Sequence, residues 1–214
     1  MGTVTIAATY GAGGSIIGPA VAERLGLPFV DRAIPTAAVT KIHEPLVAAL
    51  ADDSVTGSAV GRVLNNALSY TGLFAGIPRP AEELGVEPTV ARTELAIRKL
   101  ADGGGAVILG RAGVFTLKDR PDVLHVRLDG GVESRRRAAM KHERVVYRIA
   151  AKQQQEIDHA RRAYVAHFYP RAGAWDDPRH YHLVLDTTAI SIEASVDMIT
   201  LAARDLFATS AKGA

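Results

Sequence analysis

The chain has 214 residues, a length typical of one α/β domain. Its 25 basic and 23 acidic residues leave a net charge of +2, so a chain-wide basic surface for nucleic acid is excluded. The absence of cysteine excludes disulfide bonds, thiolate metal sites and a cysteine nucleophile. No apolar run reaches the roughly 18 residues of a membrane span, and the first residues lack the pattern of a signal peptide. We therefore expect a cytoplasmic protein.

The first predicted elements are a strand, a glycine-rich turn and a helix. Thr3–Ala8 is an apolar run rich in β-branched residues and predicts a buried strand. Glycines within residues 11–14 interrupt this run, and apolar residues at helical spacing predict a helix over 16–25, ended by Gly26. A short second strand is predicted over 27–30.

The rest of the chain alternates helices with short apolar strands. Helical sequence is predicted over 34–74, 89–101, 131–169 (as two successive helices) and 190–207, with a frayed tail after residue 208. Strands are predicted over 106–109, 123–128 and 182–185, whereas residues 75–88, which hold three prolines, predict a loop. This alternation predicts an α/β fold with a parallel sheet covered by helices on both faces.

The turn after the first strand has the outline of a phosphate-binding loop, "ATYGAGGSIIG" at residues 8–18. Glycines let the backbone approach an anion closely, and the following helix N-terminus favours phosphate. The usual loop ends in a lysine and a hydroxyl residue, but Gly14 stands at the lysine position and Ile16 near the hydroxyl position. Ser15 offers a hydroxyl at the helix start. A plain tight turn is the alternative interpretation.

Basic residues recur at the ends of the later strands. Gly110 and Arg111 follow the strand at 106–109, where an arginine can bind phosphate through its two-pronged guanidinium; a solvated loop arginine is the alternative. Arginines at 135–137 and 144 fall within a short helical stretch, and here the alternative is a solvated helix face. Asp158 and Arg161 share one helix face, with a surface salt bridge as the alternative.

In this combination of motifs the chain resembles the cytidylate kinase-like family, a branch of the P-loop nucleoside monophosphate kinases. The resemblance rests on "YGAGGSIIG", "LGLPFVDRAI", "VILGRAGVFTLKDRPDVLHVRLDG" and "IDHARRAYVAHFYPRAGAWDDPRHYHLVLDT". It implies an α/β fold with a doubly wound parallel sheet, forming a single P-loop kinase-like domain over 1–214. It further implies a helical acceptor-binding region at about 33–92 and an arginine-bearing lid at about 130–150.

The resemblance also implies roles for individual residues. The donor phosphates of ATP would lie on the loop at Gly11, Ala12, Gly13, Gly14, Ser15 and Ile16. The acceptor monophosphate would be bound by Asp31, Arg32, Arg111, Asp158 and Arg161. The lid would direct catalytic arginines at the transferred phosphoryl group, namely Arg135, Arg136 and Arg137. The cofactors implied are ATP and Mg²⁺; no residue pattern identifies the magnesium ligands.

The resulting functional hypothesis is phosphoryl transfer from ATP to CMP, dCMP or a similar monophosphate. Lid arginines and Mg²⁺ would compensate for the missing lysine, since such catalysis depends on positioning and charge neutralisation. A nucleotide-binding pseudokinase with a regulatory role is the first alternative, and a phosphotransferase with another small acceptor is the second. The expected partners are small-molecule nucleotides, not nucleic acid or membrane. The apolar helices at 34–74 are interpreted either as a homodimer surface or as core.

Overall fold

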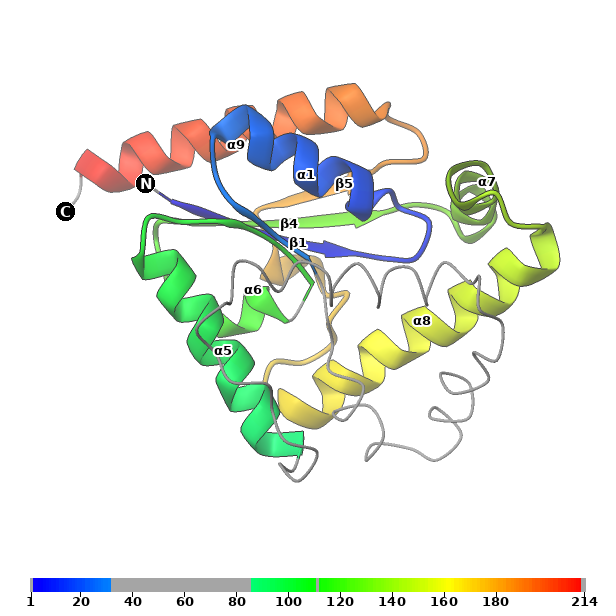
Figure 1. The fold of residues 1–214 in the computed structure, drawn as a ribbon, viewed down its shortest axis with the longest axis horizontal. Helices are drawn as coiled ribbons and strands as arrows, with labels where there is room; N and C mark the ends of the chain where they lie inside the picture. The colour runs from blue at the N-terminus through cyan, green and yellow to red at the C-terminus, as the bar shows by residue number, and fades with distance from the viewer. Residues whose placement is uncertain (1, 32–85, 111, 213–214) are drawn as a thin grey trace.

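The computed structural model describes residues 2–31, 86–110 and 112–212. Its centre is a five-stranded sheet in the order β2-β3-β1-β4-β5, and every strand pair is parallel (Figure 1). The strands are β1 (Thr3–Ala8), β2 (Phe29–Val30), β3 (Val107–Leu109), β4 (Val123–Asp129) and β5 (Leu183–Asp186). The predicted α/β fold with a doubly wound parallel sheet is thereby confirmed.

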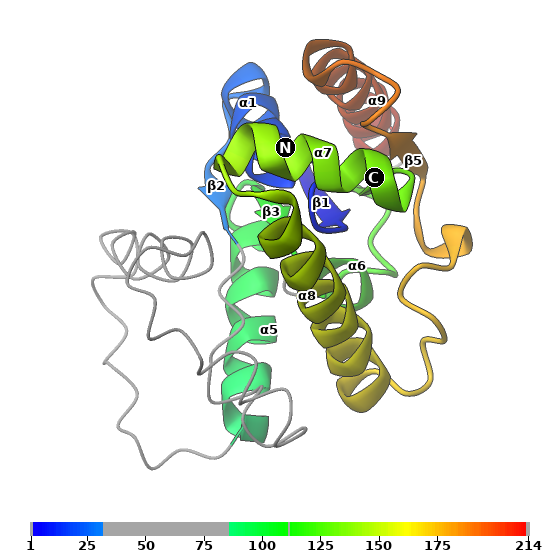
Figure 2. The same cartoon turned by 90° about the vertical axis from the view of Figure 1, so that its right-hand side faces the viewer.

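Helices cover both faces of this sheet. One face is covered by α1 (Gly14–Leu25) and α9 (Ile192–Lys212), and the other by α5 (Val86–Asp102), α6 (Gly113–Thr116) and α8 (Tyr147–Phe168) (Figure 1). A short 3₁₀ helix, Pro178–His180, precedes β5. The remaining helix, α7 (Val132–Glu143), lies at the carboxyl ends of the strands and packs on the first turns of α8 (Figure 2).

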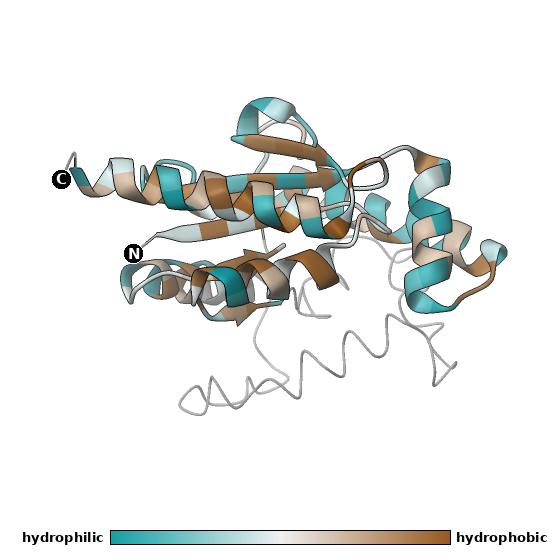
Figure 3. Cartoon of the chain, turned by 90° about the horizontal axis from the view of Figure 1, so that it is seen from above, coloured by the Kyte–Doolittle hydropathy of each residue, from teal (hydrophilic) through white to brown (hydrophobic). Residues whose placement is uncertain are grey.

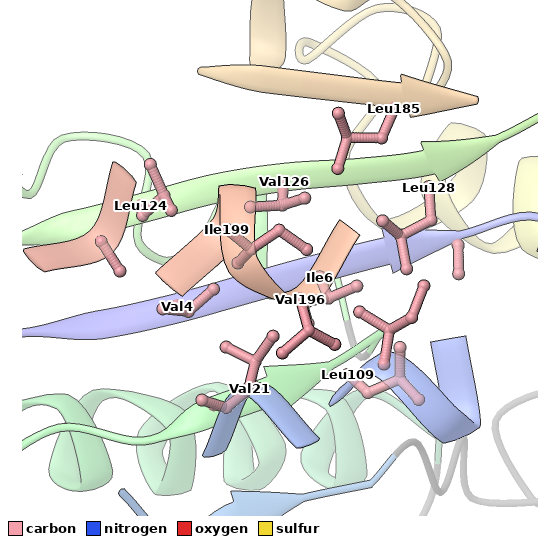
Figure 4. Packing of buried hydrophobic residues seen from close by; sticks show 14 of the residues in the cluster. Val4, Ile6, Val21, Leu109, Leu124, Val126, Leu128, Leu185, Val196 and Ile199 are labelled. Carbon is pink, nitrogen blue, oxygen red and sulfur yellow. The ribbon is translucent and has the colours of Figure 1, made fainter. Parts of the chain in front are cut away.

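The two faces of the sheet differ in polarity. Beneath α1 and α9, alternate strand residues such as Ile6, Val126 and Leu128 pack against Val196 and Ile199 to form the main core (Figure 4). This packing accounts for the apolar strands between helices of mixed hydropathy (Figure 3). Since strand side chains alternate between faces, the residues between these apolar ones point towards α8. Polar groups therefore gather on the α8 face.

The strand ends open a crevice between β1 and β3. The chain leaves β1 for α1 on one face of the sheet, and it leaves β3 for α6 on the other (Figure 1). Adjacent parallel strands whose connections diverge in this way form the usual ligand position of doubly wound folds. The glycine-rich loop after β1 lies at this point.

Most of the predicted boundaries shift by one or more residues in the structure. The second strand is limited to Phe29–Val30, where it pairs with β3. The last helix continues to Lys212 and does not fray after residue 208, because Ser210 Oγ donates a 2.7 Å hydrogen bond to the Pro121 carbonyl. The predicted helix at 89–101 is longer, Val86–Asp102. The helices predicted over 34–74 lie outside the described residues.

None of the described helices combines the length and apolarity needed to span a bilayer.

Candidate active site

The glycine loop, residues 9–15, links β1 to α1. Gly11 and Gly13 have φ angles of 79° and 70°, in the left-handed region that glycine adopts without strain. Gly11 has no room for a side chain, since a Cβ atom there would lie 2.2 Å from the Arg135 carbonyl oxygen. Gly13 caps the N-terminus of α1. The loop thus directs its backbone towards the positive end of a helix dipole.

The carbonyl groups of the loop region are held by side chains from distant parts of the chain. Arg161 Nη1 donates to the Ala8 carbonyl at 2.5 Å, and Arg135 Nη1 donates to the Tyr10 carbonyl at 2.8 Å. Thr187 Oγ1 donates to the Ala12 carbonyl, also at 2.8 Å. These three hydrogen bonds hold the carbonyl dipoles in fixed directions.

Four amide groups of the loop are left free by this arrangement, whereas those of Thr9, Tyr10 and Ala12 are bonded. Within the described part of the chain, no hydrogen bond uses the amides of Gly11, Gly13, Gly14 or Ser15. Successive free amides at a helix N-terminus form an anion-binding nest. Fixed carbonyls and free amides together make this loop suited to a phosphate group, which supports the phosphate-loop interpretation over a plain turn.

The absence of a lysine in the loop is consistent with the local packing. A Cβ atom on Gly14 would lie 2.8 Å from Ala8 Cβ and 3.1 Å from Leu109 Cδ1. The Leu109 methyl can move by side-chain rotation, but Ala8 Cβ is fixed to the backbone, so any larger residue at position 14 must displace β1 or α1. The cation that a lysine supplies in other loops has to come from elsewhere.

A buried ion pair lies directly behind the loop. Arg135 and Asp158, whose side chains are each 6% exposed, meet at 2.7 Å between Nη1 and Oδ2. Asp158 Oδ1 accepts a 2.8 Å hydrogen bond from the Tyr10 amide, and Arg135 Nε donates to the Gly130 carbonyl at 2.9 Å. Arg161 Nη1 lies 3.6 Å from Asp158 Oδ1. The alternative of a surface salt bridge between Asp158 and Arg161 is therefore wrong.

Tyr10 connects the loop to both α7 and α8. Its hydroxyl lies 2.8 Å from Glu143 Oε2, at the end of α7, and 2.7 Å from the side-chain amide of Gln153 in α8. Burial, together with the neighbouring Glu143, raises the pKa of Tyr10 above its ordinary value. The phenol is therefore neutral at physiological pH and serves as a hydrogen-bond donor. Through this residue the loop and the α7–α8 pair form one connected unit.

The three consecutive arginines of α7 lie in different environments. Arg135 is buried against the loop, as described above. Arg136 is half-buried, with Nε bonded to Gln154 Oε1 at 2.7 Å and the guanidinium 5.8 Å from the centre of the Tyr147 ring. Arg137 is exposed, as is Arg144, which ends α7 with a φ angle of 56°. One arginine is thus committed to the loop, and the others lie nearer to solvent.

Asp129, at the end of β4, is surrounded by donors. It accepts hydrogen bonds from Arg127 Nη2 at 2.7 Å, from Thr9 Oγ1 at 3.0 Å and from the Gly130 amide at 2.9 Å. Burial on its own raises the pKa of Asp129, but the hydrogen bonds from Arg127 and its charge lower this pKa below the ordinary value. The carboxylate is therefore ionised and already neutralised by an arginine.

Sequence reasoning missed Arg127 and Thr187. Arg127 is 3% exposed and lies 4.5 Å from the centre of the Trp175 ring and 5.8 Å from that of Tyr181. Its Nη1 atom is buried and makes no hydrogen bond within the described residues. The period-two spacing of His125, Arg127 and Asp129 in "VLHVRLD" was an available signal, because it places all three on one face of β4. Thr187 gave no comparable signal.

The other predicted residues are distributed as follows. Asp31 is half-buried and follows β2. Ser15 and Ile16 are exposed at the start of α1, whereas Ala12 is buried. Arg32 and Arg111 lie outside the described residues. The structure thus brings together the glycine loop, Arg135, Asp158 and Arg161 at one place.

A small cavity opens beside the loop on the α8 face. Its volume is about 60 Å³, and it lies among β1, Gly110, Arg161, Tyr164 and Trp175. This space holds a few water molecules, whereas small-molecule sites usually span roughly 300–1,000 Å³. A nucleoside can enter here only if the aromatic side chains move.

A resident metal site is not formed by the described residues alone. Over 2–31, 86–110 and 112–212, no group of three or more histidine or acidic side chains is arranged to hold a metal ion. Asp129 is an unfavourable direct ligand because Arg127 already neutralises it.

Comparisons with known proteins match both the sequence and the fold. The model of the cytidylate kinase-like family matches residues 3–189. No curated protein matches the chain in sequence.

Two solved structures share the fold. One is an uncharacterized protein from Eubacterium ventriosum ATCC 27560, with a TM-score of 0.65 and 18% identity over 95% of this chain and 99% of that one. The other is an unliganded sugar kinase from Janibacter sp. HTCC2649, with a TM-score of 0.51 and 17% identity over 96% of this chain and 95% of that one.

Proposed function

Because the chain belongs to the cytidylate kinase-like family, we propose that it transfers a phosphoryl group from ATP to CMP, dCMP or a similar monophosphate. Membership of this family supports a kinase-like phosphotransferase activity, whereas the identities of the acceptor and of the phosphoryl donor are what we propose. The observation that carries the proposal is the glycine loop. Carbonyls in and just before the loop are bonded to Arg161, Arg135 and Thr187, while the amides of residues 11 and 13–15 stay free of hydrogen bonds within the described residues.

The donor phosphates would lie on the free amides of the loop. The amides of Gly11, Gly13, Gly14 and Ser15 and the N-terminus of α1 would offset the phosphate charge. Mg²⁺ would enter with ATP and add positive charge between the phosphates, with its remaining ligands from water. Because the loop is held in place before binding, little reorganisation is needed at the moment of transfer.

The acceptor would lie on the other side of the crevice, between β1 and β3. Arg161 lines the cavity there, and its guanidinium is the described group best placed to bind a monophosphate. Arg111 and the region at about 33–92 would complete the acceptor site, as the family resemblance implies. Movement of the aromatic side chains that line the cavity of about 60 Å³, Tyr164 and Trp175 among them, would enlarge it to admit the nucleoside.

Charge neutralisation without a loop lysine would depend on the α7 arginines. Arg136 and Arg137 lie nearer to solvent than Arg135, so their rotation towards the transferred group disturbs no buried ion pair. Loss of one such donor costs on the order of 10²- to 10³-fold in rate. We accordingly assign Arg136 and Arg137 the catalytic role and Arg135 that of holding the loop.

A second candidate function is a nucleotide-binding pseudokinase with a regulatory role. It is favoured by two observations: Gly14 leaves no room for a lysine, and both Arg135 and Asp158 are fully engaged with one another and with the loop backbone. Such a protein would bind ATP and release no ADP.

The test is an ADP-release assay with ATP, Mg²⁺ and a panel of nucleoside monophosphates. The proposal expects turnover with a cytosine monophosphate and a loss of at least about tenfold in kcat/KM for Arg161→Gln. Arg204→Gln on α9 is the matched control, since this arginine is exposed on the opposite face of the sheet. ATP-dependent thermal stabilisation without turnover on any acceptor would favour the pseudokinase.

The proposed cellular location and partners follow from these substrates. A kinase that uses ATP and a nucleoside monophosphate finds both in the cytoplasm, and its partners are then small-molecule nucleotides. Homodimer formation through 34–74 stays a prediction, because that segment lies outside the described residues.

A further inference from the structure

A second recess lies on the α8 face, away from the glycine loop. It is a groove of about 760 Å³ beside α6, the first half of β4, the C-terminal end of α8 and the segment that leads to β5. That end of α8 is opposite to the end that packs on α7 (Figure 1). Its volume falls within the usual range for a small-molecule site, roughly 300–1,000 Å³.

The groove has an excess of positive charge. Lys118, Arg171 and Arg179 line it, and no carboxylate is among its described lining residues. Arg179 is held by Asp177 at 2.6 Å, but Lys118 and Arg171 are exposed and form no ion pair within the described part of the chain. Two cations are therefore free to bind an anion.

Three histidines form one wall of the groove. His125 Nδ1 lies 2.7 Å from Thr5 Oγ1, and the His125 ring stacks on that of His182 at 5.2 Å between centroids. The His125 amide donates to His182 Nδ1 at 3.0 Å. Because Nδ1 of His182 accepts this bond, a neutral His182 carries its proton on Nε2. His182 is exposed, so this N–H is available to a ligand in the groove.

Two further nitrogens in this wall lack partners. His125 is only 3% exposed, and its Nε2 atom makes no hydrogen bond within the described residues; the same holds for the buried Nε2 atom of His180. A buried polar atom left unpaired costs about 1–3 kcal/mol, and such atoms in a folded protein call for an explanation. Both nitrogens are shielded from solvent, so a ligand in the groove would reach them only after the imidazole rings rotate.

We propose that this groove binds a phosphate group, either free phosphate or pyrophosphate or the phosphate arm of a nucleotide. Arg171 would supply the two-pronged contact that suits phosphate oxygens, Lys118 a second charge, and the exposed His182 imidazole a further hydrogen-bonding contact. Phe115 and Tyr169, which stack at 5.4 Å in the same wall, offer an apolar surface to the base of a nucleotide. The groove shares no residue with the glycine loop, but it shares Val114 and Phe115 with the cavity proposed for the acceptor.

The test follows the imidazole signals of the full chain by ¹⁵N–¹H correlation spectroscopy during separate titrations with phosphate, pyrophosphate and CMP. Phosphate or pyrophosphate on the glycine loop does not touch the groove histidines. CMP in the acceptor cavity would contact Phe115, whose ring lies 5.1 Å from that of His180, so His182 is the signal that reports most directly on the groove. We expect saturable shifts of the His180 and His182 signals. The double variant Lys118→Gln/Arg171→Gln should weaken this binding by at least about tenfold.

The matched control is Lys141→Gln/Arg148→Gln, which removes two exposed cations from α7 and α8 outside the groove. Unchanged titration of the groove histidines in this control is expected. Equal affinity for CMP and inorganic phosphate would identify free phosphate as the ligand, whereas tighter binding of CMP would identify a nucleotide. Imidazole signals that stay unmoved by all three anions, or an affinity unchanged by the groove variant, would overturn the proposal.

Discussion

The buried pair of Arg135 and Asp158 gives the sharpest prediction. Asp158→Asn keeps the shape of the side chain and an oxygen for the Tyr10 amide, but it removes the charge that faces Arg135 at 2.7 Å. Both side chains are 6% exposed, so the arginine charge gains little from solvent and keeps Asp129, 3.7 Å from its Nε, as a more distant carboxylate neighbour. Breaking a buried pair from one side costs about 3–5 kcal/mol.

The measurement is urea unfolding of the full chain. With a slope of about 2–3 kcal/mol per molar urea, the expected loss lowers the midpoint by more than about 1 M. Glu156→Gln is the matched control, because it makes the same chemical change on the same helix in an exposed pair with Lys152 at 3.8 Å. That control should change stability by less than about 1 kcal/mol.

A double-mutant cycle separates the pair from its surroundings. Arg135→Gln and the combined variant complete the cycle, and residues in such direct contact couple by about 0.5–3 kcal/mol. We expect the upper part of that range. A coupling energy near zero, or an Asp158→Asn variant as stable as the Glu156→Gln control, would refute the assignment of this pair as the support of the loop.

Three further predictions concern other residues of the loop and sheet. Gly14→Lys should lose about 1–3 kcal/mol in urea unfolding and gain no ADP-release activity, because its Cβ would lie 2.8 Å from Ala8 Cβ; a faster enzyme would contradict this. Thr187→Val should weaken ATP binding by calorimetry about fivefold through loss of one hydrogen bond, and Thr187→Ser should not. Burial in the first place, and then the neighbouring His182, lower the pKa of His125 from 6.5 to about 4. The unfolded chain therefore binds this proton at a higher pH than the folded chain does. The free energy of unfolding should be highest above pH 6.5 and fall by up to about 3 kcal/mol towards pH 4. His125→Asn should flatten that pH profile, and an unchanged profile would count against the assignment.

The local sequence was sufficient to predict most of the fold. Thr3–Ala8 was predicted as a strand with the observed bounds, because a β-branched run between turn residues has few other stable conformations. The two helices between the fourth and fifth strands were also predicted. Contacts between residues that are distant in the sequence were not predicted. One of them, the hydrogen bond from Ser210 to Pro121, lies in the added C-terminal part of α9, and no local sequence pattern encodes it.

The sequence predicted which residues form the candidate site better than it predicted how those residues are arranged. Spacing placed Asp158 and Arg161 on one helix face, but spacing cannot say whether that face meets solvent or the loop. Burial beside Tyr10 depends on where α8 packs. Thr187 was missed for the same reason, since an ordinary threonine after a strand becomes significant only when the Ala12 carbonyl lies 2.8 Å away.

The bonds that shape the glycine loop also impose an order of events during synthesis. The loop leaves the ribosome among the first fifteen or so residues, yet its carbonyl partners are Arg135, Arg161 and Thr187. Contacts so distant in sequence form late, because the intervening chain must be ordered first. The nascent chain therefore emerges with an unformed loop and acquires its anion nest only after β5 has been made. On the proposed function, phosphate affinity would therefore arise only in a chain that extends through Thr187.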